Sequence, residues 1–84
     1  MNEIEAKLNE LKNNIRIRTR ELKQLNPDHD LLKFEKPMLG EKEWTTELEA
    51  EFIERVAPTK NVPNIMLLAA YLALLELATG NISK

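Results

Sequence analysis

The chain has no cysteine, one histidine and only two glycines among its 84 residues. The lack of cysteine excludes a disulfide framework and a cysteine-based zinc site. One histidine without cysteine does not complete a transition-metal shell, and two separated glycines do not form a phosphate-binding loop. With so few groups for nucleophilic or acid–base chemistry, we predict that the protein is not an enzyme and needs neither a cofactor nor a metal.

Strong charge of one sign and long hydrophobic runs are also missing. The formal net charge is -2, so no field of the whole protein attracts nucleic acid or an anionic membrane. The longest apolar run, Ile65 to Leu75, is well short of the about 20 residues that span a bilayer. With 43% hydrophobic and 31% charged residues, these features indicate a cytoplasmic protein with a single helical domain over residues 1–84.

Helix-forming sequence is abundant, most clearly near the C-terminus. Residues 62–79 are a nearly continuous apolar segment of good helix formers, and Gly80 is placed to end it. Asn61 or Thr59 is in position to cap its start, and Pro63 suits the first turn. Because such a helix has no polar face, protein must cover most of its circumference.

A second helix is predicted over residues 3–25, where apolar residues alternate in spacing between four and three. This heptad seam has one gap, at Arg18. An arginine there can fix the register of a helical assembly, extend its charged end to the surface, or pair with a carboxylate of another helix. The seam consists of Ile4, Leu8, Leu11, Ile15, Leu22 and Leu25.

The C-terminal half of this helix is basic, which raises the question of a phosphate-bearing ligand. A guanidinium group donates two hydrogen bonds at once and therefore suits phosphate. Against nucleic acid stands the lack of aromatic residues between the basic ones, since bases stack on such side chains. Nucleic-acid or nucleotide binding is therefore the alternative function. The possible phosphate-binding residues are Arg16, Arg18, Arg20 and Lys23.

A third helix is predicted over about residues 42–57, starting either near Glu41 or at Thr46 and ending before Pro58. Thr46 and Glu49 have the spacing of a capping box at its start. Its other faces are rich in glutamate, so it complements the basic half of the first helix and is expected to pair with it, within one chain or between subunits. One apolar stripe recurs every fourth residue, at Trp44, Leu48, Phe52 and Val56.

Between the first and third helices, residues 28–36 are predicted to form a packed loop or a short helical turn. Asp28 or Asp30 is suited to cap such a turn. The run Asp28, His29 and Asp30 is a poor metal site, because adjacent residues along a turn seldom converge on one ion. The apolar anchors expected to hold this segment down are Leu31, Leu32, Phe34, Met38 and Leu39.

The apolar C-terminal helix needs more cover than two amphipathic stripes and one packed loop provide. An exposed apolar patch usually marks an association surface, so we expect this helix to pack against its symmetry mate in a homo-oligomer, most simply a dimer. The sequence leaves open whether Glu76 faces a cavity, the basic helix or the solvent near the end of its own helix. The expected interface residues are Ile65, Leu68, Ala69, Leu72, Ala73 and Glu76.

The sequence thus predicts an all-α domain, a small bundle of three main helices that acts by binding. We expect a non-enzymatic protein–protein interaction module, an adaptor, regulator or inhibitor of a larger protein. Its predicted partners are a second copy of itself and an unidentified protein, with no membrane partner. Because short chains without cysteine are common among bacterial and phage proteins, we expect such an origin.

Overall fold

The computed structural model describes residues 3–56 and 64–80, and this part of the chain is all-α, as predicted. The helices are α1 (Glu3–Leu25), α2 (Glu35–Leu39), α3 (Thr46–Val56) and α4 (Asn64–Ala78), and the 3₁₀ helix η1 (Asp30–Phe34) precedes α2. The three-helix bundle is not confirmed, because the described residues contain α2 as a fourth helix. Among the described helices, none is long and apolar enough to cross a membrane.

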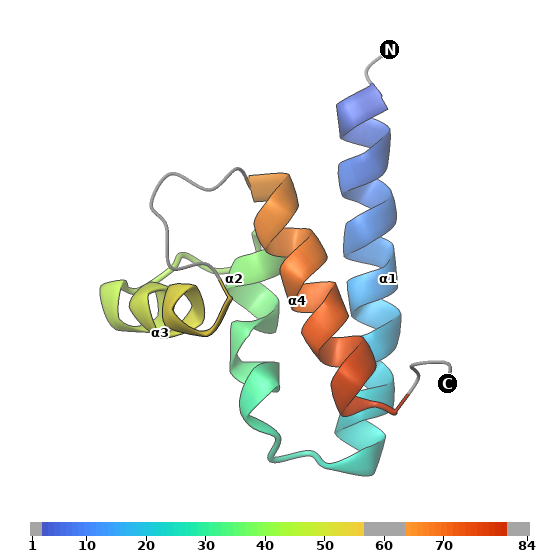
Figure 1. Ribbon diagram of the computed structural model, residues 1–84, viewed down its shortest axis with the longest axis vertical. Helices are drawn as coiled ribbons and strands as arrows, with labels where there is room; N and C mark the ends of the chain where they lie inside the picture. Colours follow the sequence, from blue (N-terminus) through green and yellow to red (C-terminus); the bar gives the residue numbers. More distant parts are fainter. Residues whose placement is uncertain (1–2, 57–63, 81–84) are drawn as a thin grey trace.

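The two longest helices, α1 and α4, lie side by side and run in the same direction (Figure 1). η1 and α2 return in the opposite direction beside them, and α3 crosses at a steep angle on the side away from α1. With 23 residues, α1 is about 34 Å long, against about 22 Å for the 15 residues of α4. The ends of α1 therefore extend beyond its partner, which leaves Ile4 and Leu25 exposed.

The buried face of α1 consists of Leu11, Ile15, Thr19 and Leu22. The gap in the heptad seam is therefore filled by Thr19 and not by Arg18, which lies beside the buried face and is partly exposed. The Thr19 hydroxyl is satisfied, since it donates to the Arg16 carbonyl at 3.0 Å and lies 3.0 Å from Glu35 Oε2. Because its side chain is small and its hydroxyl is satisfied, Thr19 can be buried at this position, whereas a buried guanidinium would need a paired charge.

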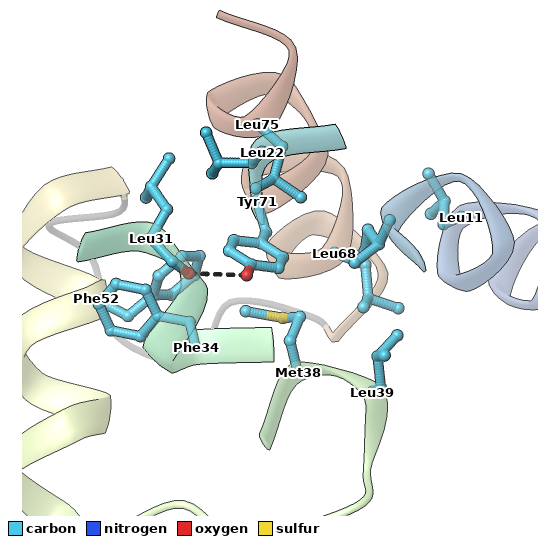
Figure 2. Packing of buried hydrophobic residues seen from close by; sticks show 11 residues of the cluster. Leu11, Leu22, Leu31, Phe34, Met38, Leu39, Phe52, Leu68, Tyr71 and Leu75 are labelled. Carbon is cyan, nitrogen blue, oxygen red and sulfur yellow. Dashed lines mark hydrogen bonds between the residues drawn. The ribbon is translucent and has the colours of Figure 1, made fainter. Parts of the chain in front are cut away.

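All four aromatic residues of the chain meet in one cluster in the core. Phe34 lies between Phe52 of α3 and Tyr71 of α4, with ring centroids 5.1 Å and 6.4 Å away. Trp44 covers the cluster from outside, 5.9 Å from Phe52. The buried Tyr71 hydroxyl donates a 2.7 Å hydrogen bond to the Leu31 carbonyl (Figure 2). This cluster joins η1, α3 and α4.

The segment after α1 is more regular than predicted, because a 3₁₀ helix leads directly into α2. His29, and neither Asp28 nor Asp30, caps η1, with Nδ1 accepting from the Leu31 amide at 3.1 Å. Gly40 ends α2 with φ 81°, donating to the Pro37 carbonyl at 3.1 Å. The next amide, of Glu41, bonds the Lys36 carbonyl at 2.9 Å, which completes a Schellman motif. The predicted anchors Leu31, Phe34, Met38 and Leu39 are buried, and Leu32 packs against them.

Of the two starts predicted for α3, the one at Thr46 is confirmed and the earlier one is wrong, because residues 42–45 are not helical. Thr45 caps the helix with its hydroxyl accepting from the Leu48 amide at 3.1 Å, so no capping box between Thr46 and Glu49 forms. The predicted stop of α4 is confirmed at Gly80, which has φ 70°. The predicted helix ends at residues 57 and 62 lie outside the described residues, as do the proposed caps Thr59 and Asn61 and the proposed first-turn residue Pro63.

Candidate functional site

One side of α4 faces away from the other helices that the structure describes and is apolar. Leu68, Tyr71 and Leu75 on the opposite side are fully buried in the core. Residues three and four apart share a helix face, so one continuous surface is formed by exposed side chains at such spacings. We call this surface the outer face of α4; it consists of Met66, Ala69, Ala73 and Leu77, bordered by the partly buried Ala70 and Glu76.

The residues of the predicted interface lie on different sides of α4 in the single chain. Ala69 and Ala73 are exposed as expected. Leu68 is 0% exposed within the single chain, and its place in the predicted interface is wrong because the core already contains it. Ile65 and Leu72 pack partly against the core. Met66 and Leu77, which are 58% and 62% exposed, were not predicted, since a helix apolar on all sides does not reveal in its sequence which side the core covers.

The basic residues of α1 do not form one surface. Arg18 pairs with Glu21 on its own helix, at 2.9 Å. Arg16, Arg20 and Lys23 lie together on another side of α1, where they line a groove of about 200 Å³ between α1 and α2. The structure thus brings together three of the four predicted phosphate-binding residues.

Two carboxylates lie on the other wall of this groove, beside Leu39. Glu35 of α2 pairs with Lys23 at 3.3 Å, and Glu41 after α2 lies 3.5 Å from Arg16. The electrostatic complement of α1 is therefore provided by α2 and the turn that follows it. The expected pairing with the glutamates of α3 is wrong within the chain, because none of the ion pairs among the described residues joins these two helices.

The acidic side of α3 pairs with η1 instead. Glu51 pairs with Lys33, and Arg55 pairs with both Asp30 and Glu51. The hydrogen bond from Lys33 and then that from Arg55 hold the pKa of the Asp30 carboxyl below its ordinary value, and the Lys33 hydrogen bond lowers the pKa of Glu51. Arg55 also lies over the Phe34 ring, 5.5 Å from its centroid. These exposed pairs orient α3 on the aromatic cluster, and we see in them a structural role.

A metal site is not formed by the part of the chain that the structure describes, which contains no group of three potential ligands. His29 instead uses Nδ1 to cap η1. Glu76 lies at the border of the outer face of α4, partly exposed. Comparison with protein-family models, with curated proteins and with solved structures finds no match to this chain. The candidates for function are therefore the outer face of α4 and the groove beside α1.

Proposed function

We propose that this chain is a non-enzymatic interaction protein that associates with a second copy of itself through the outer face of α4. The observation that supports it is the exposure of Met66, Ala69, Ala73 and Leu77 on a helix that is well packed on its other side. In a soluble chain, an exposed helix side without a charge is the kind of surface that a protein partner covers. An adaptor or regulatory role toward a larger protein is part of the same proposal.

The pattern of side-chain size on this face is self-complementary. Along α4 it reads large, small, small, large, at Met66, Ala69, Ala73 and Leu77. A two-fold axis that pairs two antiparallel copies of α4 places each Met66 opposite the partner's Leu77 and brings the alanines together at the centre. Alanines there allow the helix axes to approach closely, near the lower end of the usual range of about 8–10 Å. A second copy therefore fits this face without any further change.

The affinity of such a dimer depends on the balance between the apolar surface that it buries and the cost of association. Burying a Leu or Met side chain completely contributes about 1.5–3 kcal/mol, while association costs about 4–15 kcal/mol in lost freedom. Met66 and Leu77 are already partly covered in the monomer, so their gain is smaller than the full value. The gain from two copies of Met66 and Leu77 is therefore at most similar in size to the cost of association, and we expect a weak dimer that forms only at high protein concentration.

The proposal predicts that Ala73→Glu abolishes self-association and leaves the fold intact. Ala73 is exposed in the monomer, so a carboxylate there stays solvated, whereas in the dimer it lies buried and unpaired. The dissociation constant should rise by about two orders of magnitude. Sedimentation equilibrium over a concentration series measures this, with the wild type shifting from 9.7 kDa toward twice that mass.

Ile17→Glu is the matched control, because Ile17 is also an exposed apolar residue but lies on α1. It should dimerise as the wild type does. A wild-type chain that remains a monomer at the highest soluble concentration contradicts the proposal, as does equal weakening by the two variants.

A further inference from the structure

The groove between α1 and α2 is lined by more positively than negatively charged side chains. Arg16, Arg20 and Lys23 line one wall, and Glu35 and Glu41 line the other, which leaves one positive charge in excess. Thr19 forms part of the lining between them. No residue of the outer face of α4 takes part, so the groove is independent of the proposed dimer interface.

The two carboxylates are held very differently. Glu35 pairs with Lys23 at 3.3 Å and lies 3.0 Å from the Thr19 hydroxyl, and its side chain is only 18% exposed. Glu41 is half exposed and meets Arg16 at the long distance of 3.5 Å. Exposed pairs of this kind contribute little and exchange readily with solvent ions. Glu35 is therefore a structural part of the groove. The ion pair of Glu41 with Arg16, in contrast, can be replaced by another anion.

Of the three cations that line the groove, Arg20 is the one without an ion-pair partner among the described residues. No carboxylate of the described residues lies within ion-pairing distance of its guanidinium. It is one helical turn from Arg16 on the same side of α1, so the two side chains can reach a common ion. The pair presents two guanidinium forks, each able to donate two hydrogen bonds to one group.

We propose that this groove binds a small phosphate-bearing anion, which replaces the Glu41 carboxylate on Arg16 and bridges to Arg20. A monocarboxylate would gain little, because it only exchanges one carboxylate for another. A phosphate group carries more charge and three terminal oxygens, and it can therefore engage both arginines at once. Lys23, one turn beyond Arg20, contributes a third positive charge at the far end of the groove.

Nucleic acid fits the groove less well than a small anion. A polynucleotide needs a continuous basic surface, but Arg18 lies on another side of α1 with Glu21, and the groove wall carries two carboxylates. No aromatic side chain lines the groove to stack on a base. Recognition is thus limited to the phosphate group, whether it comes from inorganic phosphate, pyrophosphate or the diphosphate of a nucleotide.

The test is a titration of the wild-type chain with pyrophosphate at low salt, followed by the amide shifts of α1 and α2 in NMR spectra. Saturable shifts around Arg16, Arg20 and Glu41 are expected, with weaker binding of orthophosphate. ADP should bind about as well as pyrophosphate, and adenosine should not bind. A flat titration with pyrophosphate, or binding of adenosine, overturns the proposal.

Three single variants separate this site from general attraction to a basic helix. Arg20→Gln should weaken pyrophosphate binding about tenfold, the usual effect of losing one charge-assisted contact. Arg18→Gln, the matched control on the other side of α1, should bind as the wild type. Glu41→Gln should bind several-fold more tightly, because it removes the competing carboxylate. Equal losses in the two arginine variants, or weaker binding by the Glu41 variant, overturn the assignment. Each replaced side chain is at least partly exposed, and far-UV circular dichroism verifies the fold.

Discussion

Tyr71 connects two parts of the fold through one atom. Its buried hydroxyl donates to the carbonyl of Leu31, forty positions earlier in the chain, and its ring contacts both phenylalanines. Burial, and then the charge of Glu35, raise the pKa of the Tyr71 hydroxyl well above its ordinary value of 10.0. The neutral phenol is therefore the form that the native state contains.

This raised pKa predicts a loss of stability at alkaline pH. Below about pH 10 the tyrosine keeps its proton in both states, and its contribution is complete. Above that pH the unfolded chain releases the proton while the native chain retains it, so the free energy of unfolding falls by about 1.4 kcal/mol per pH unit. Urea unfolding followed by far-UV circular dichroism measures this decline.

Tyr71→Phe separates this effect from the titration of lysines. The variant leaves the Leu31 carbonyl without its buried donor, which should cost about 1–3 kcal/mol at neutral pH. It should also have a shallower decline above about pH 10, because it lacks the group that titrates. If both proteins lose stability with the same slope, the hydroxyl is not buried as described.

At the scale of a helix, the start of α3 gives a sharp test of capping. The Thr45 hydroxyl accepts from the Leu48 amide, and Thr46 is already helical. Thr45→Ala should therefore destabilise the protein by about 1 kcal/mol, as loss of an N-cap does. Thr46→Ala is the control and should change the free energy of unfolding by a few tenths at most. Chemical unfolding of both variants measures this. A larger loss of stability for Thr46→Ala than for Thr45→Ala would contradict the Thr45 cap and support the capping box of Thr46 with Glu49.

The helices with a clear pattern could be predicted from the sequence, and their contacts could not. The bounds of α1 match the prediction, because its apolar spacing and terminal residues agree. α2 was not predicted as a helix because Pro37 and Gly40 are turn signals. Pro37 lies in the first turn of α2, where a proline is tolerated, and Gly40 is the left-handed residue just past the end.

For the candidate site too, the sequence predicts which residues of one helix lie together but not which residues of other elements lie opposite them. The basic cluster of α1 is visible in the sequence, but the position of Glu35 and Glu41 opposite it depends on how α2 returns along α1. On α4, the sequence indicates a helix that needs cover on every side, and its only charged residue, Glu76, does not mark the side that stays uncovered. Only packing against α1 and the aromatic cluster decides which residues remain outside.

At the scale of the whole molecule, the orientation of the proposed dimer is testable because the chain has no cysteine of its own. In the antiparallel pairing, an equimolar mixture of Met66→Cys and Leu77→Cys should form a mixed disulfide dimer under mild oxidation. Met66→Cys alone should form little, because its two copies lie at opposite ends of the interface. Mass spectrometry distinguishes the products. Ready oxidation of Met66→Cys alone indicates a parallel pairing and contradicts the proposed geometry.

The convergence of all four aromatic residues on one cluster has a consequence for any optical experiment on this protein. Trp44 is the only tryptophan and thus the only strong intrinsic fluorophore, and it lies against the other aromatic residues where η1, α3 and α4 meet. An intrinsic fluorescence or near-ultraviolet signal therefore reports on this junction alone. Neither the groove beside α1 nor the outer face of α4 carries a chromophore, so ligand or partner binding there can be complete while the spectrum stays unchanged.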